Sequence, residues 1–403
     1  IYLTATGRND WESRLAFSDY KSFFYPSIGL SAILTSMFNA PDWLTYLKVR
    51  GSYTEVGNSY GRFMTTVTYP YDEQTQSWTS TSSYPNTKLK PERTKSWEVG
   101  LDARILNDIS LNLTYYRSNT YNQTFYADLS LSSGYSNIPI QSGNIMNEGL
   151  EMSLGYNKQW KDFSFNTNYT LTWNKNRVKR LADGVYNYAT GQPIQMPELS
   201  PLTYGHTDAR LILRVGGSMG DVYGQRLLKR DLNGYILNEE GVGLAMENKE
   251  TYLGSILPKM NMGWSLGFGY KGVNLGMTFT GRFGGIVISE TQSVLDAAGV
   301  SKVSADVRDA GGVQINQSKV SAQTYYQTIQ GTAAYYTYSA TNVRLGELSL
   351  SYTLPKKWFD NKVGMTVGLV GKNLWMIYCK APFDPELTTS AASNFYQGFD
   401  AYM

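Results

Sequence analysis

Apolar and polar residues alternate over long stretches of this chain. In the stretch FSFNTNYTLTW, residues 163–173, aromatic and aliphatic residues mostly occupy one set of alternate positions, while Ser, Asn and Thr occupy the other. The apolar set comprises Phe163, Phe165, Tyr169, Leu171 and Trp173. Successive side chains of a strand point to opposite faces, so this period of two predicts a strand with one apolar and one polar face.

The same alternation predicts further strands elsewhere in the chain. They are ISLNLTYY (109–116), GWSLGFGYKG (263–272), VNLGMTFTGRF (273–283), ELSLSYTLP (347–355) and VGMTVGLVG (363–371). Their polar positions mostly hold Ser, Thr, Asn and Gly, whereas the water-facing side of an ordinary sheet carries more Lys and Glu. Small polar residues suit a crowded lumen, and the apolar face then requires lipid. Because strands in lipid must pair every backbone group, the pattern predicts an all-β fold, a transmembrane antiparallel β-barrel.

The connections between predicted strands also alternate in length. Short turns are expected within 104–110, 156–164 and 271–272, and long extracellular loops near 68–90, 182–204 and 286–341. Outer-membrane barrels have short turns on one rim and long loops on the other, whereas soluble domains rarely carry several long irregular loops. We expect about a dozen strands in a single barrel portion that covers residues 1–403.

Composition supports a membrane protein and argues against nucleic-acid binding. The chain has 32 Tyr and 9 Trp among 403 residues, and these side chains favour membrane interfaces, although they also stack on sugars and bases. The net charge is only +3, with Lys and Arg scattered singly, so no nucleic-acid partner is expected. We find no run of 18 apolar residues, so no transmembrane helix is expected.

Several segments carry motifs that occur together in one family. They are GRNDWESRL and SFFYPSIGLS (7–15, 22–31), LTYLKVRGSYTEVGNS (44–59), NTKLKPERTKSWEVGLD (86–102), NIMNEGLEMSL (144–154), RDLNGYI followed by YLGSILPKMNMGWS (230–236, 252–265), TNVRLGELSLSYTLPKKW (341–358) and GLVGKNLWMIYCKAPFDPE (368–386). In order and spacing they resemble the C-terminal half of SusC/RagA-type TonB-dependent outer-membrane transporters. Thr54 and Glu55 depart from the family pattern.

This resemblance implies an integral protein of the bacterial outer membrane, of Bacteroidetes origin. It implies a barrel of about 22 strands, an N-terminal plug and a Ton box through which TonB–ExbB–ExbD acts. It also implies a SusD-like surface lipoprotein as partner and an oligosaccharide or peptide as substrate. We recognise no plug or Ton box in the sequence and expect the chain to be a portion of the barrel.

Two acidic motifs are candidates for chemistry. In RDLNG, Asp231 and Asn233 are spaced like the first ligands of a calcium loop, although an Asx turn explains the same residues more simply. In FDPEL, Asp384 and Glu386 could form a catalytic carboxylate pair, but the motif fits a structural loop better. A possible structural Ca²⁺ is therefore the one cofactor considered, and no enzymatic activity is expected.

Single His and Cys residues offer little chemistry. His206 is the one histidine and lacks partners for a metal site or a triad, and Cys379 is the one cysteine, which precludes an intrachain disulfide. We expect the first to be solvated and the second to be packed or in contact with lipid.

Aromatic residues in the long loops are candidate substrate contacts. They are Trp78, Tyr84, Tyr186, Tyr188, Tyr325, Tyr326, Tyr335 and Tyr336. These rings could stack on a glycan, or they could belong to the interface girdle or to packing within the loops.

Taken with the resemblance, the pattern predicts an energised importer. Two alternatives stay open. The first is a passive porin-like or adhesin-like barrel, which needs neither plug nor TonB. The second is a soluble β-sandwich domain that binds carbohydrate through its Tyr and Trp residues.

Overall fold

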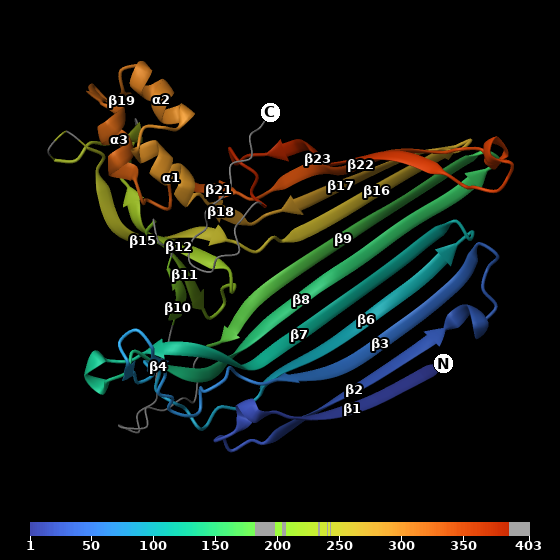
Figure 1. Ribbon diagram of the computed structural model, residues 1–403, viewed down its shortest axis with the longest axis horizontal. Helices are drawn as coiled ribbons and strands as arrows, with labels where there is room; N and C mark the ends of the chain where they lie inside the picture. Colours follow the sequence, from blue (N-terminus) through green and yellow to red (C-terminus); the bar gives the residue numbers. More distant parts are fainter. Residues whose placement is uncertain (182–197, 204–206, 233, 240, 242, 387–403) are drawn as a thin grey trace.

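The computed structural model describes residues 1–181, 198–203, 207–232, 234–239, 241 and 243–386. Eleven long strands form one antiparallel sheet, and they lie side by side in chain order (Figure 1). The strands are β1 (Tyr2–Trp11), β2 (Ser22–Ile33), β3 (Leu44–Asn58), β6 (Glu92–Ile105), β7 (Ile109–Asp128), β8 (Asn137–Trp160), β9 (Phe163–Arg180), β16 (Met260–Tyr270), β17 (Val273–Phe283), β22 (Asn342–Thr353) and β23 (Thr366–Cys379). The all-β antiparallel prediction is therefore confirmed.

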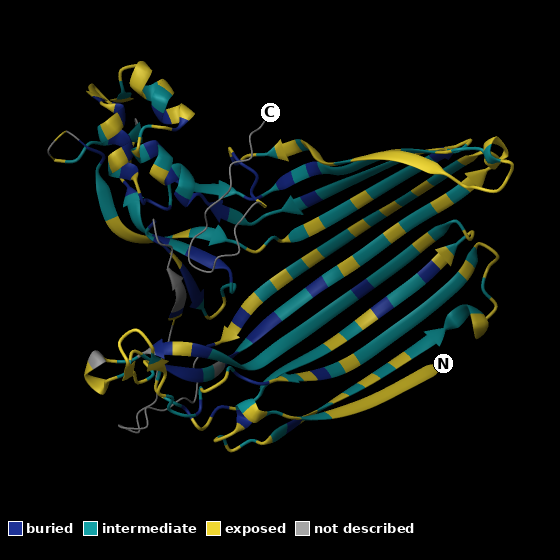
Figure 2. Ribbon diagram, viewed as in Figure 1, coloured by how far each residue is buried: buried dark blue, intermediate teal, exposed yellow. Residues whose placement is uncertain are grey.

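The pairing register aligns the apolar residues of all these strands on one face. Phe268 of β16 lies opposite Phe165 of β9 and Leu275 of β17, and Leu275 in turn lies opposite Leu350 of β22. Directly paired residues of antiparallel strands share a face, so each pair extends the same apolar surface. Large apolar side chains on it are exposed, including Val99, Trp264 and Leu369. Figure 2 shows the resulting alternation of exposed and less exposed residues along the strands.

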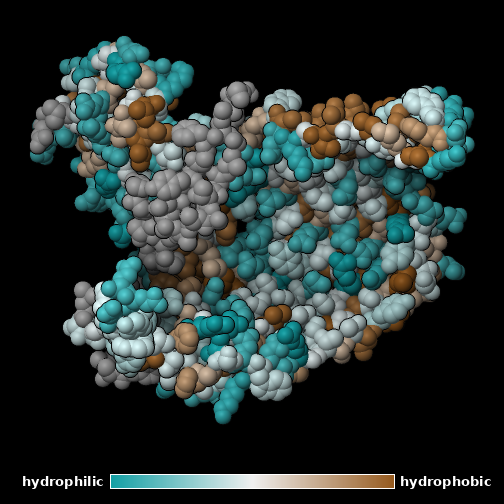
Figure 3. Space-filling view, viewed as in Figure 1, coloured by the Kyte–Doolittle hydropathy of each residue, from teal (hydrophilic) through white to brown (hydrophobic). Residues whose placement is uncertain are grey.

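The opposite face is polar and hollow. Gly267 pairs with Asn166 and with Gly276, so small or polar residues face each other where the apolar face has rings. At Gly149 a Cβ would lie 2.5 Å from the carbonyl oxygen of Trp173 and 2.6 Å from Oη of Tyr116, so only glycine fits beneath this tyrosine. Figure 3 shows the hollow face coloured mostly teal to white. Small residues allow the sheet to curve toward this side.

Short turns gather at one end of the sheet (Figure 1). Lys161 and Asp162 join β8 to β9, and Lys271 and Gly272 join β16 to β17. Lys161 and Lys271 adopt left-handed φ angles of 49° and 46°, which match the twist of two-residue hairpins. The long connections lie at the other end, as the alternation of loop lengths predicts.

The connection 286–341 corrects the expectation of an irregular loop. It contains β18 (Ile286–Ile288), α1 (Glu290–Ala297), α2 (Lys302–Asp309), β19 (Val313–Ile315), β20 (Ser318–Val320), α3 (Ala322–Ile329) and β21 (Thr337–Ser339), and we call it the helical cap. Ser289, Ser301 and Ser321 each accept a backbone N–H at their helix N-terminus, at 3.0, 3.0 and 3.1 Å. These caps replace hydrogen bonds that a short helix otherwise lacks.

A second, four-stranded sheet lies between the main sheet and the cap. Its strands lie in the order β10 (Glu198–Thr203), β11 (Ala209–Arg214), β12 (Asp221–Leu228) and β15 (Met246–Ser255). In the sequence, a separate small hairpin of β13 (Arg230–Asp231) and β14 (Gly234–Tyr235) comes between β12 and β15. Leu211 and Leu213 of β11 are buried in one cluster with Phe125, Ile140 and Val178 of the main sheet. Apolar packing thus fixes this sheet on the long-connection end. Another small hairpin, β4 (Tyr71–Asp72) and β5 (Ser77–Trp78), lies within the loop 68–90.

Within the described residues, no helix has the length and hydrophobicity needed to cross a membrane.

Lysine substitutions on the two faces of β9 test which face meets lipid. Leu171 lies mid-strand on the apolar face between Met152 and Met262, and Thr170 lies on the polar face between Ser153 and Gly263. We expect Leu171→Lys to lower the free energy of unfolding in liposomes by about 2–4 kcal/mol, and Thr170→Lys by less than about 1 kcal/mol. Equal losses would contradict the assignment of the faces.

Candidate functional site: the polar face and its rim

A charged network crosses three neighbouring strands on the polar face. Nη1 of Arg50 in β3 donates to both carboxylate oxygens of Asp102 in β6, at 3.1 and 2.9 Å, and its Nη2 donates to Oγ1 of Thr114 in β7 at 2.6 Å. Asn112 donates to the same carboxylate, and Arg50 lies over Gly100. The hollow therefore presents fixed donors and acceptors rather than mobile side chains.

A second charged network folds the FDPE segment onto the same face. Arg344 of β22 donates to both carboxylate oxygens of Asp384 at 2.7 Å and lies 3.4 Å from Oε2 of Glu386. Asn342 accepts from Arg344 at 3.2 Å and donates to Glu386 at 3.1 Å. Arg344 pairs in register with Thr280 on the polar face. Asp384 and Glu386 are thus both engaged by one guanidinium, and this geometry describes a structural anchor rather than an acid–base pair.

Arg214, at the end of β11 in the second sheet, is an arginine with two carboxylate partners. Arg214 donates to Oε2 of Glu198 and to Oε1 of Glu250, both at 2.5 Å, and its guanidinium lies 4.5 Å from the ring centroid of Tyr223. Hydrogen bonds to these two carboxylates raise the pKa of Arg214 above its ordinary value. Tyr223 also packs against Tyr252, with ring centroids 5.3 Å apart. The charges of Arg214, Glu198 and Glu250 are therefore paired with one another.

Asp208 joins the second sheet to the helical cap. Its carboxylate accepts from the backbone N–H groups of Gln225 at 2.9 Å, Arg226 at 2.5 Å and Ala333 at 2.6 Å. Its own backbone N–H donates to the carbonyl of Gly331 at 2.8 Å. Charge-assisted hydrogen bonds are the stronger kind, so one side chain fixes the turn before β21 against β12.

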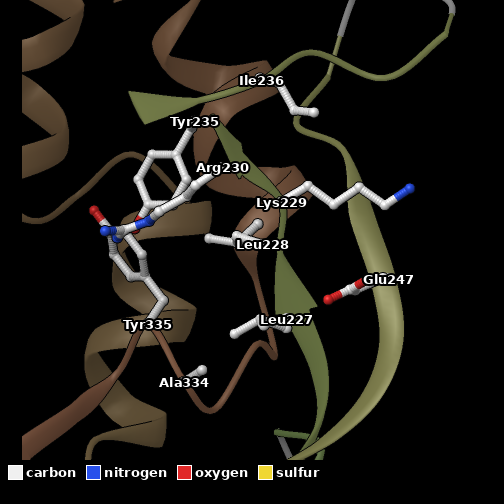
Figure 4. Close-up of a pocket in the computed structure, with 9 residues that line it drawn as sticks. All are labelled: Leu227, Leu228, Lys229, Arg230, Tyr235, Ile236, Glu247, Ala334 and Tyr335. Carbon is white, nitrogen blue, oxygen red and sulfur yellow. The ribbon is translucent and has the colours of Figure 1, made fainter. Parts of the chain in front are cut away.

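Several cavities lie around the described part of this rim. One of about 660 Å³ is bounded by the end of β12, the β13–β14 hairpin, β15 and residues 334–335 (Figure 4). Another of about 520 Å³ separates β9 from the second sheet, and a third of about 620 Å³ lies among the three helices of the cap. These volumes are in the range of small-ligand sites.

The aromatic candidates in the loop 68–90 are exposed and paired with other rings. Trp78 is 71% exposed and packs against Tyr71, with centroids 5.1 Å apart. Tyr84 packs edge-on against Tyr135 at 5.1 Å. Both are accessible to a ligand, and their role as substrate contacts stays a prediction.

The four tyrosines of the helical cap are placed differently from one another. Tyr325, Tyr326 and Tyr336 are 6%, 2% and 0% exposed and form the core of the cap, so they leave no ring face for a glycan. Burial raises the pKa of Tyr326 to about 12. Tyr335 is half-buried and lines the 660 Å³ cavity. Residues 186 and 188, the remaining tyrosine candidates, lie outside the described residues.

The calcium candidate is described only in part. Asp231 pairs with Gly234 in the β13–β14 hairpin, and Asn233 lies outside the description. No group of three or more His, Cys, Asp or Glu suited to a metal occurs in the part of the chain that is described. The structural Ca²⁺ stays a prediction. His206 is likewise not described, and Cys379 is half-buried with its thiol directed at the carbonyl of Ala381 at 3.5 Å.

These features define a class, the two-faced wall of an antiparallel β-barrel with a folded rim on one side. A family model described as TonB dependent receptor-like, beta-barrel, matches residues 2–374, and the chain belongs to this family. The resemblance to SusC/RagA-type proteins is confirmed by the relatives and structures that follow.

Relatives extend over most of this chain but less than half of their own length. TonB-dependent receptor P3 of Formosa agariphila is 25% identical over 416 residues, which cover 95% of this chain and 40% of that protein. TonB-dependent receptor SusC of Bacteroides thetaiotaomicron is 27% identical over 154 residues, covering 38% of this chain and 14% of that protein. The chain therefore spans about two-fifths of the P3 relative.

Solved structures agree with the fold. The RagAB peptide transporter matches with a TM-score of 0.74 at 22% identity, covering 95% of this chain and 43% of that chain. The RagAB peptide importer in its closed-closed state matches with a TM-score of 0.72 at 20% identity, again over 95% and 43%.

Removal of Arg344 tests the anchor on the polar face. We expect Arg344→Met to destabilise by about 3–5 kcal/mol, because Asp384 is left buried without its partner. The double variant R344M/D384L should recover most of this loss. Hydrogen exchange of residues 379–386, with unfolding in liposomes, measures both effects. The control is Lys357→Met at an exposed position, which should change stability by less than about 0.5 kcal/mol. An equally small effect of Arg344→Met would contradict the role of Arg344 as a structural anchor.

Proposed function

We propose that this chain forms part of the wall of a TonB-dependent importer of SusC/RagA type in the bacterial outer membrane. The observation that carries the proposal is the register of the eleven-stranded sheet, which places apolar residues on one face and a polar, charged network on the other. A sheet of this kind suits a wall between lipid and a water-filled lumen. Strands outside the described sheet complete the wall by pairing with β1 and β23.

The polar face and the rim serve uptake of an oligosaccharide or a peptide. Family membership supports TonB as the source of energy, acting with ExbB and ExbD through parts of the protein beyond this chain. The likeness to the RagAB peptide transporter supports a peptide as substrate. The resemblance to SusC/RagA-type transporters implies an oligosaccharide as the other candidate and a SusD-like lipoprotein as partner on the rim. The wall itself performs no covalent chemistry.

The exposed apolar face argues against the soluble β-sandwich alternative. A sandwich covers its apolar faces with a second sheet, about 10 Å away. Among the described residues, the apolar face of β16 and β17 has no such cover, and Trp264 is 41% exposed there. Lipid is the medium that suits this surface.

Gentle detergent extraction of the full-length protein from native outer membranes tests the proposal. We expect mass spectrometry to identify a co-purifying SusD-like lipoprotein together with bound oligosaccharide or peptide. Uptake of that ligand by cells should stop when tonB is deleted, and an unrelated porin from the same membranes serves as the control. A lone barrel with open ion conductance in planar bilayers would instead favour the passive porin.

A further inference from the structure

Two cations line the 660 Å³ cavity at the rim, and neither forms an ion pair with a carboxylate in the described part of the chain. Arg230 and Lys229 both line it, and no described carboxylate forms an ion pair with either. The one acidic residue of the lining, Glu247, lies 3.8 Å from Lys249. The cavity therefore carries a net positive charge, which favours an anionic ligand.

An aromatic ring holds the Arg230 side chain in place, while several N–H donors of its guanidinium make no hydrogen bond to the described residues. Its guanidinium lies 4.2 Å from the ring centroid of Tyr235, and Nη2 donates to the hydroxyl of the same tyrosine. Figure 4 shows both side chains on the same side of the cavity as Tyr335. A guanidinium has five N–H donors, so most of them stay available to a ligand.

Arg214 shows what a purely structural arginine of this sheet looks like. It also stacks on a tyrosine, but Glu198 and Glu250 both accept from it. Arg230 has the same aromatic support without the two carboxylates. Among the described residues, Arg230 therefore has no counterpart of Glu198 and Glu250, and its guanidinium can accommodate an added carboxylate.

Tyr335 supplies a neutral hydroxyl to the same cavity. Its oxygen accepts from the hydroxyl of Tyr325 at 3.4 Å, which leaves its own proton free to donate. Burial raises the pKa of Tyr335, so the hydroxyl stays protonated at neutral pH. Packing against Tyr336, at 5.0 Å between centroids, fixes the ring.

We propose that this cavity binds a carboxylate of the transported molecule, with the Arg230 guanidinium and the Tyr335 hydroxyl as donors; the Lys229 side chain extends away from these two groups and adds positive charge only at longer range (Figure 4). This inference rests on the proposed import function. A uronic acid sugar and the C-terminus of a peptide carry the same carboxylate, and the cavity volume suits two or three residues of either. Planar, bidentate recognition of carboxylates is a property of arginine.

Calorimetry on the full-length protein in nanodiscs tests the proposal with two matched pairs of probes. The first pair is trigalacturonate and its methyl ester, and the second is trialanine and trialanine amide. We expect the acid of one pair to bind about tenfold more tightly than its neutral form, and the pair that responds identifies the source of the carboxylate.

Variants assign this preference to the cavity. Arg230→Gln should remove the tenfold preference, and Arg230→Lys, which keeps the charge but not the fork, should retain part of it. Lys302→Gln removes one charge from an exposed position of the cap and should leave the preference unchanged. Heat-modified mobility on gels checks that each variant is folded.

Three results would overturn the inference. They are equal binding of acid and neutral forms, an unchanged preference in Arg230→Gln, and no binding of any of the four probes by the folded wild type. If TonB-dependent uptake persists in those cases, the carboxylate site fails and the import function stands. If uptake is absent as well, the proposed function fails.

Discussion

Backbone pairing across the long sheet is the constraint on which the rest of the structure depends. A strand in hydrocarbon cannot leave N–H or C=O groups unpaired, because each one costs several kcal/mol. Within the sheet the chain meets this requirement through a continuous antiparallel ladder from β1 to β23, and only the outer edges of these two strands are left to pair with further strands. Once the ladder is fixed, its register places Phe268 beside Phe165 and Leu275, and the two-faced wall follows.

The rim is free of this constraint and folds by the rules of soluble proteins. Its helices begin at serine caps, its core is a cluster of tyrosines around Tyr336, and Asp208 ties it to the second sheet. Because the rim lies at the long-connection end, polar groups there can be left for a ligand. Arg214 has two carboxylate partners, whereas Arg230 stacks on a tyrosine without forming an ion pair among the described residues.

Alternation in the sequence predicted the wall well and the rim poorly. The stretch 163–173 lies within β9, and 263–270 and 273–283 lie within β16 and β17, because a period of two has a direct meaning in a strand. The helices of the cap are eight residues each, too short for a helical period to stand out. The loop 286–341 therefore looked irregular.

Side-chain partners were harder to predict than strands. Arg50 and Asp102 lie on polar positions of their strands, but their meeting depends on the register between β3 and β6. Tyr325 and Tyr336 fitted a glycan site by composition, and tertiary packing buries them. Arg344 and Asp384 are 40 residues apart, and no local pattern joins them.

The central claim is that alternate residues of β9 meet lipid and lumen. Spin labels at single cysteines along residues 164–172, in full-length protein with Cys379 replaced by Ser, allow collisions with lipid-dissolved oxygen to be measured in liposomes. The account predicts oxygen accessibility that peaks at 165, 167, 169 and 171 and falls at the even positions between them. Maxima at the even positions, or no period of two, would contradict it.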